Sequence, residues 1–142
     1  MDLSKDLFLR YFGNKITQDE LYVSIGVKDA EFEQFLLTEM VHAYKQEDAE
    51  MIEYLIFTIF LAEDELNISS FLDILNKLIL CKWHEKHEDI VFLLQKIRDS
   101  ESVECLYQAI FLRPAYLKWD DNYSFERKCI HAIAKCGNQE AV

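Results

Sequence analysis

Apolar residues recur along almost the whole chain at the three- and four-residue spacing of an amphipathic helix. Acidic and hydroxyl residues stand where helices would begin, and glycine, asparagine or proline stands where several of them would end. The pattern therefore predicts an all-α protein of about eight helices. They are expected over residues 3–12, 17–26, 29–44, 48–62, 69–82, 87–98, 100–112 and 122–136, with 138–142 as the first turn of another.

The second of these helices has a defined start and end in the sequence. Thr17 and Glu20 have the spacing of a capping box, and Gly26 follows as a stop signal. The apolar residues between Leu21 and Val27 also alternate with a period of two, so a short strand is the alternative for this stretch.

The helix over 48–62 has almost no polar interruption from Tyr54 to Leu61. A helix that is apolar on nearly all sides is expected at the centre of its protein, with partners around it. The preceding helix is expected to begin at Asp29 as its N-cap and to bury a stripe of its own. That stripe consists of Phe32, Phe35, Leu36, Met40, Val41 and Tyr44.

Composition excludes an all-β fold. The 142 residues contain three glycines and one proline, whereas a sandwich or barrel needs a turn signal every ~8–12 residues. With 51% hydrophobic residues the chain is expected to form one helical domain over 1–142. Within it, residues 1–67 form acidic N-terminal helices and 68–142 form HEAT-like helix pairs.

The HEAT-like expectation comes from an internal repeat. Leu94–Val103 aligns without a gap with Ile133–Val142, at an offset of 39 residues. A period of ~40 residues with two helices per unit is typical of HEAT-type solenoids, so a right-handed stack of antiparallel helix pairs is expected. The shared identities are Lys96/Lys135, Glu101/Glu140 and Val103/Val142.

Charge is distributed unevenly. The net charge is −11, with 16 Asp and Glu against 5 Lys and Arg in residues 1–75 and 10 against 10 in residues 76–142. Such a surface repels nucleic acid and anionic membranes and attracts a basic macromolecule.

The longest uncharged apolar run, Tyr54–Ala62, is too short to span a bilayer, and the start of the chain is acidic. A cytoplasmic location is expected, with the four cysteines reduced and buried.

Two groups of residues are candidates for a metal site or a catalytic site. Cys81, His84 and His87 could bind zinc if they converged, but their spacing matches no standard motif, and the preferred interpretation is a helix end followed by a helix start. Cys129 and His131 point about 200° apart on one helix, so they cannot form a dyad. We expect no enzyme activity, no metal and no cofactor.

Recognition residues are expected in two places. Acids bracket the helix over 48–62, and aromatic residues with acids fill the connection after Pro114, where they could bind a basic partner. The alternatives are a solvated acidic surface and aromatic side chains packed beneath their own loop. The candidate residues are Glu47, Asp48, Glu50, Glu53, Glu63, Asp64, Glu65, Trp119, Asp120, Asp121 and Tyr123.

From Trp83 onward the chain resembles a family of small bacterial HEAT-like proteins. These include immunity proteins of contact-dependent growth inhibition and related polymorphic toxin systems. The resemblance runs through Trp83-His84, His87–Val91, Leu94-Gln95, Asp99 with Ser102-Val103, Leu106–Ala109, Pro114–Tyr123, Arg127–Ile130, and Gly137 with Glu140–Val142.

The resemblance implies a protein that binds the toxic C-terminal domain of a large secreted protein and blocks it, commonly by covering a nuclease active site. We therefore expect an immunity protein that forms a 1:1 complex with a basic toxin domain, with a ribonuclease favoured. The alternative is a helical-repeat adaptor that binds another protein without neutralising a toxin.

Overall fold

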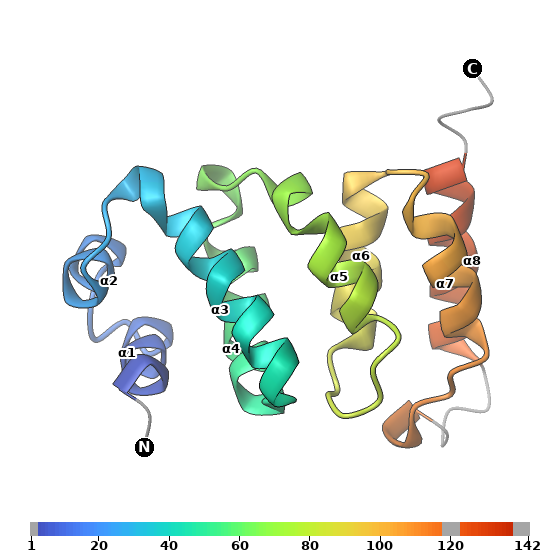
Figure 1. Ribbon diagram of the computed structural model, residues 1–142, viewed down its shortest axis with the longest axis horizontal. Coiled ribbons are helices and arrows are strands. Elements are labelled where there is room, and N and C mark those ends of the chain that lie inside the picture. Colours follow the sequence, from blue (N-terminus) through green and yellow to red (C-terminus); the bar gives the residue numbers. More distant parts are fainter. Residues whose placement is uncertain (1–2, 118–122, 138–142) are drawn as a thin grey trace. The chain divides into compact units, whose positions relative to one another are not determined.

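The computed structural model describes residues 3–117 and 123–137. Within these residues the chain forms eight α-helices and four short 3-10 turns, and no strand, so the all-α prediction is confirmed (Figure 1). None of the helices in this part of the chain combines the length and the apolar character needed to cross a membrane. The structure divides into two compact units, residues 1–67 and 68–142.

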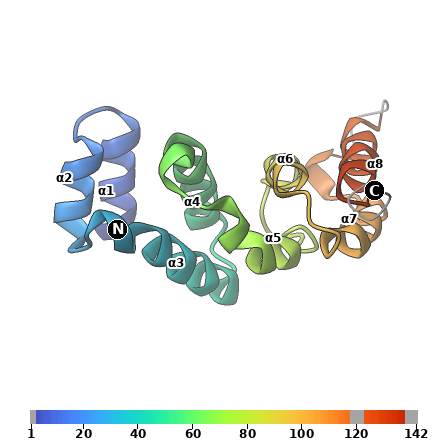
Figure 2. The same cartoon turned by 90° about the horizontal axis from the view of Figure 1, so that it is seen from above.

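The N-terminal unit, residues 1–67, is built on two pairs of helices that contact each other, in one place through the Tyr22 and Phe32 rings, whose centroids are 4.4 Å apart. α1 packs against α2, α3 packs against α4, and α1 also packs against α4 (Figure 2). Its helices are α1 (Leu3–Phe12), α2 (Gln18–Ile25), α3 (Phe32–Gln46) and α4 (Ala49–Leu61), and its 3-10 turns are η1 (Asp29–Glu31) and η2 (Glu63–Glu65). Its core includes Phe8, Leu21, Phe32, Leu36, Met40, Ile52, Leu55 and Ile59.

The C-terminal unit, residues 68–142, follows a related plan. α5 packs against α6 and α7, and α8 packs against both α6 and α7. The helices are α5 (Leu72–Leu78), α6 (His87–Ile97), α7 (Ser102–Ile110) and α8 (Ser124–Gly137), and the 3-10 turns are η3 (Ile68–Phe71) and η4 (Ala115–Leu117). The core includes Phe71, Leu75, Leu78, Ile90, Leu94, Leu106, Phe125 and Cys129.

The local signals around α2 are correct in detail. Thr17 Oγ1 accepts a hydrogen bond from the Glu20 backbone N–H at 3.1 Å, and the Glu20 carboxylate accepts one from the Thr17 N–H at 3.2 Å. Gly26 ends the helix with a φ of 77°, in the left-handed region. The alternative of a strand for this stretch is therefore wrong.

The start of α3 differs from the prediction. Residues Asp29–Glu31 form a 3-10 turn, and α3 begins at Phe32 without a side-chain capping bond. Instead, the Glu31 N–H donates to the Lys28 carbonyl at 2.8 Å, and the Glu31 carboxylate accepts from the Lys28 N–H at 3.1 Å. The prediction that Asp29 is the N-cap is wrong because the preceding turn already uses these backbone groups.

Two consecutive cap residues join α3 to α4. Glu47 ends α3 in the left-handed conformation with a φ of 52°, and its N–H bonds the carbonyls of the last turn. Asp48 then begins α4, because its carboxylate accepts a hydrogen bond from the Met51 N–H at 3.1 Å. The connection therefore contains no residue without a capping role.

The prediction that α4 is surrounded by partners is wrong on one side. Most of its apolar residues are buried, including Ile52 and Leu55, but Phe57 is 46% exposed and Leu61 is 50% exposed. Apolar composition alone told us that α4 has little polar surface; it did not tell us which of its sides the fold covers.

The four cysteines are free thiols. Cys129 and Cys136 are buried, as predicted, whereas Cys81 and Cys105 are half-buried. The prediction of burial is therefore correct for the two on α8 only. The turn suggested for 138–142 and a cap at Asp121 or Asn122 fall outside the described residues.

The two helix-terminal glycines provide a matched pair for testing the α2 cap. Gly26→Ala should lower the free energy of unfolding by about 1 kcal/mol, because a Cβ is disfavoured at its positive φ. Gly137→Ala should be neutral or slightly stabilising, because Gly137 lies in helical backbone with open space around a new Cβ. Urea unfolding of the two variants measures both effects. Equal losses would show that the Gly26 conformation does not matter.

Candidate protein-binding surface

α1 and α4 meet through a cluster of aromatic rings. The Phe12 ring lies 4.7 Å from Phe57 and 5.8 Å from Tyr54 between centroids, and 6.0 Å from Tyr11. Both contacts with α4 are edge-on, at interplanar angles of 79° and 67°, which is a favourable geometry for aromatic pairs. Side chains that are more than forty residues apart in the chain thus form one apolar surface.

Two leucines extend this surface at the solvent side. Leu9 lies one helical turn before Phe12 on α1 and is 41% exposed, and Leu61 lies one turn after Phe57 on α4. We call the set of Leu9, Tyr11, Phe12, Tyr54, Phe57 and Leu61 the α1–α4 face. Single exposed leucines are ordinary, but exposed leucines next to an exposed aromatic ring form a patch of the kind that binds another molecule.

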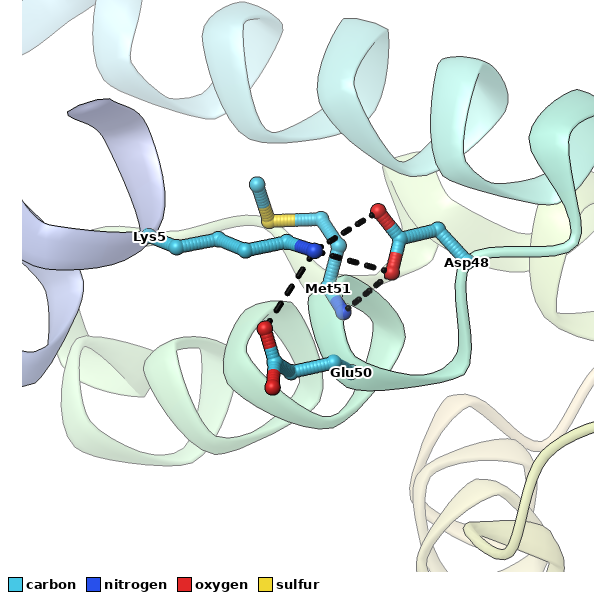
Figure 3. A network of polar contacts seen from close by, with 4 residues as sticks. All are labelled: Lys5, Asp48, Glu50 and Met51. Atoms are coloured by element: carbon cyan, nitrogen blue, oxygen red, sulfur yellow. Dashed lines mark hydrogen bonds and ion pairs between the residues drawn. The ribbon is translucent and has the colours of Figure 1, made fainter. Parts of the chain in front are cut away.

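At the start of α4, the acidic residues Asp48 and Glu50 both face Lys5 of α1 (Figure 3). Lys5 on α1 reaches across with its Nζ 3.1 Å from Asp48 Oδ2 and 3.3 Å from Glu50 Oε1. The hydrogen bond to Asp48 raises the pKa of Lys5. Partial burial favours the neutral form of Asp48, but the Met51 N–H and the Lys5 ammonium together lower its pKa. The pair therefore ties α1 to the first turn of α4.

Acidic residues at both ends of α4 affect the pKa values of the two tyrosines of the face. Loss of solvent and the nearby Glu50 and Glu53 carboxylates raise the pKa of Tyr54. Burial and the Glu65 carboxylate raise the pKa of Tyr11. The α1–α4 face therefore extends into the negative field of an acidic group at each end.

The acids that follow α4 form the second group. Glu65 accepts hydrogen bonds from the Tyr22 hydroxyl at 2.9 Å and from the Gln18 side-chain amide, so it ties η2 to α2. Asp64 is exposed beside it. Carboxylates just after a helix face the negative end of its dipole, which is unfavourable by a few tenths of a kcal/mol each. Helix electrostatics therefore explains the acids before α4 and does not explain those after it.

The predicted acids thus separate into two groups rather than one cluster. α4 has 13 residues, which places its ends about 20 Å apart. Asp48 and Glu65 are held by bonds within the chain, and Glu47 has its backbone in the α3 cap. Glu47, Glu53, Asp64 and Glu65 are exposed. The remaining two are Glu50, which pairs with Lys5, and Glu63, which is half-buried in η2.

The predicted aromatic loop is described only at its edge. Tyr123 is 50% exposed with a φ of 56°, and the Arg113 guanidinium lies 5.2 Å from its ring centroid. Trp119, Asp120 and Asp121 lie outside the described residues. The structure therefore places neither the acids nor the tryptophan of this loop.

The contribution of α1 to the α1–α4 face was not predicted from the sequence. A helix over 3–12 was expected, but Lys5, Leu9 and Phe12 were not singled out as binding residues. The sequence does contain a signal, because Leu7, Phe8 and Leu9 are consecutive apolar residues and one buried side of a helix does not need all three. In the structure Leu7 and Phe8 are buried and Leu9 is exposed.

The histidine group in the C-terminal unit is a structural hydrogen-bonded network. The His84 and His87 rings are buried and stacked, with centroids 4.2 Å apart. His84 Nε2 lies 2.7 Å from the Leu78 carbonyl oxygen, and His87 Nε2 faces the Cys81 carbonyl oxygen. Because carbonyl oxygens only accept, both rings carry their proton on Nε2.

The Nδ1 atoms of both rings are acceptors. His84 Nδ1 accepts from the Lys86 N–H at 3.0 Å, and His87 Nδ1 lies 2.8 Å from the Tyr116 hydroxyl. Burial lowers the pKa of both histidines, that of His87 to about 4, where the neighbouring His84 adds to the effect. Every ring nitrogen is therefore engaged, and the part of the chain that the structure describes contains no group of three His, Cys, Asp or Glu residues that could hold a metal ion.

The second candidate pair from the sequence, Cys129 and His131, does not come together in the structure. Cys129 is buried and His131 is exposed on the other side of α8. Burial raises the pKa of the Cys129 thiol to about 12, which keeps it protonated and unreactive at neutral pH. Cys129 therefore serves the core.

The histidine network should make the protein acid-sensitive. Both histidines have a folded pKa below the unfolded value of about 6.5, so their contribution is complete above that pH and is lost as the pH falls from about 6.5 towards the folded value of about 4 for His87. His87→Leu should cost about 1–3 kcal/mol at pH 7, because the Tyr116 hydroxyl and the Cys81 carbonyl lose a partner.

The difference between wild type and His87→Leu should shrink on acidification, as measured by urea unfolding between pH 7 and pH 4. The exposed His131 supplies the control, because His131→Leu should follow the wild-type pH dependence. A difference between wild type and His87→Leu that stays constant with pH would contradict the network.

The Lys5 bridge should be measurable through salt. Lys5→Met should lower the free energy of unfolding by about 0.5–1 kcal/mol at low ionic strength, because Asp48 and Glu50 lose the cation between them. High salt should reduce that loss. Lys15→Met, at an exposed residue of the same charge, is the control, and an equal salt-dependent loss there would show that only net charge is being measured.

Comparison with protein-family models, with curated proteins and with solved structures finds no match to this chain.

Proposed function

We propose that this protein is an immunity protein, which binds a basic toxin domain through the α1–α4 face and neutralises it. The observation that carries this proposal is the exposed apolar face between two acidic groups. Leu9, Phe57 and Leu61 supply exposed apolar surface, and Glu53 and Asp64 are exposed acids at its two ends. An apolar centre with a charged rim is the usual anatomy of a protein–protein interface.

Charge supports a basic partner. Residues 1–67 contain 15 Asp and Glu against 5 Lys and Arg, so the unit that carries the face is strongly negative. A nuclease cleft carries cations that hold phosphate groups, and exposed carboxylates can occupy the same cations. In this mechanism, electrostatic attraction speeds the encounter and the apolar face holds the complex.

The state of the candidate catalytic residues supports binding rather than catalysis. The two buried histidines have all their ring nitrogens in structural hydrogen bonds, and Cys129 is a buried, protonated thiol. These groups stabilise the C-terminal unit. We therefore assign the function to surface contacts.

We also infer that the C-terminal unit is HEAT-like. α5 with α6 and α7 with α8 form successive pairs, and α5 contacts α7 while α6 contacts α8. Successive helix pairs that stack in this way are what the repeat from Leu94 to Val142 predicts. In this interpretation the C-terminal unit is a scaffold and the N-terminal unit carries the partner-specific surface.

Co-expression tests the proposal directly. The protein is produced together with the C-terminal domain of the protein encoded immediately upstream of its gene, with a tag on that domain alone. We expect a salt-sensitive 1:1 complex and the loss of the toxicity of that domain. No complex, or a complex that leaves the domain toxic, would contradict the immunity function, and the second result would favour an adaptor.

Charge reversal then tests the surface. Glu53→Lys with Asp64→Lys should slow association about tenfold at low ionic strength and much less at high ionic strength. Glu101→Lys with Glu104→Lys changes the net charge equally at exposed acids of the C-terminal unit and should leave the rate nearly unchanged. Equal slowing by both pairs would show that the α1–α4 face does not direct the encounter.

A further inference from the structure

We infer that the segment of the partner that docks on the α1–α4 face is an amphipathic helix with Lys or Arg at both ends. This inference rests on the proposed function and adds the shape and charge of what is bound. It depends on three features of the N-terminal unit: the spacing of the exposed residues, the two-helix construction of the face, and the separation of its acidic ends.

The spacing of the exposed residues matches one stripe of a helix. Along α4, Glu50, Tyr54, Phe57 and Leu61 follow one another at intervals of four, three and four residues and are exposed or half-buried. Residues at alternating intervals of three and four lie along one stripe of a helix, which is the side that a neighbouring helix can cover. This side of α4 therefore packs against α1 through Tyr54 and Phe57 and still leaves Phe57 and Leu61 about half exposed.

The face is also built from two helices rather than one. Phe12 of α1 contacts Phe57 of α4 ring against ring, and Leu9 continues the apolar surface on α1. A third helix over this seam would bury the exposed parts of Leu9, Phe57 and Leu61 together. Binding of an amphipathic helix by such a surface is a common mode of recognition, read as apolar residues at intervals of three and four.

Strand addition is a poor alternative here. Pairing of an extended segment needs an open sheet edge, and the part of the chain that the structure describes has no strand. An extended segment on this surface would leave its backbone groups without partners, whereas a helix satisfies them internally.

The acids set the charge and length of the bound helix. The exposed Glu53 lies towards the start of α4 and the exposed Asp64 follows its end. Lys5 lies between Asp48 and Glu50, and the exposed Glu53 lies one turn before Phe57 on α4. Glu53 and Asp64 are 11 residues apart, roughly 16 Å along a helix, so a bound helix of about 11 residues places one cationic end near each acid.

Synthetic peptides test this inference on the full chain. The probe is a fluorescein-labelled peptide with leucines on one helical face, lysines at both ends and alanines elsewhere. One matched peptide has glutamates in place of the lysines, and another has a central proline, which breaks the helix. Fluorescence anisotropy at low and high ionic strength measures the dissociation constants.

The basic helical peptide should bind, and high salt should weaken it. Phe57→Ser and Leu61→Arg should each weaken binding about tenfold or more. Tyr107→Ser and Phe111→Ser are the matched controls, because these residues form an exposed aromatic pair on α7, with centroids 5.3 Å apart. They should leave binding unchanged. Leu61 has half its surface exposed, so Leu61→Arg keeps the test valid if Phe57→Ser lowers stability.

Three outcomes would overturn the inference. The proline or the glutamate peptide could bind as tightly as the basic helix, the α7 variants could weaken binding as much as the α4 variants, or the basic peptide could fail to bind. If the basic peptide does not bind but co-expression abolishes the toxicity of the partner domain, the partner segment is not a helix of this kind and the proposed function stands. If the basic peptide binds but co-expression leaves the partner domain toxic, the face binds a basic helix and the immunity function is contradicted.

Discussion

The packing of α1 against α4 is the contact on which the candidate surface depends. It combines the Phe12 ring contacts with Tyr54 and Phe57, at 5.8 and 4.7 Å, with the ion pair from Lys5 to Asp48. The rings bring the two helices together, and the lysine offsets the repulsion between carboxylates at the start of α4. Without this contact, α1 would contribute nothing to the face, and the aromatic residues of α4 would stand alone.

Local signals predicted much of the fold. Thr17, Gly26 and Asp48 act within a few residues of their own position, so their capping roles follow from the sequence. Asp29 is the exception, because the 3-10 turn before α3 competes for the same backbone groups. Apolar periodicity shows how much of a helix avoids water, whereas which side a neighbour covers depends on long-range packing; α4 was therefore placed too deeply.

The candidate site was harder to predict for the same reason. Seven acids around α4 look equivalent in the sequence, yet Asp48 is held by Lys5, and Glu65 by Tyr22 and Gln18, all more than forty residues away. No local pattern encodes such partners. The acids could be found from composition, but which of them are exposed, and the α1 residues beside them, required the fold.

The short connection between α3 and α4 limits how this surface can change over evolution. Glu47 and Asp48 are both cap residues, so an inserted or deleted residue there would turn the residues of α4 by about 100° relative to α3. Phe57 and Leu61 would then turn away from α1, and buried residues would turn outward. New specificity at this face is therefore reached by replacing exposed side chains on an unchanged frame, and not by varying the length of the loop.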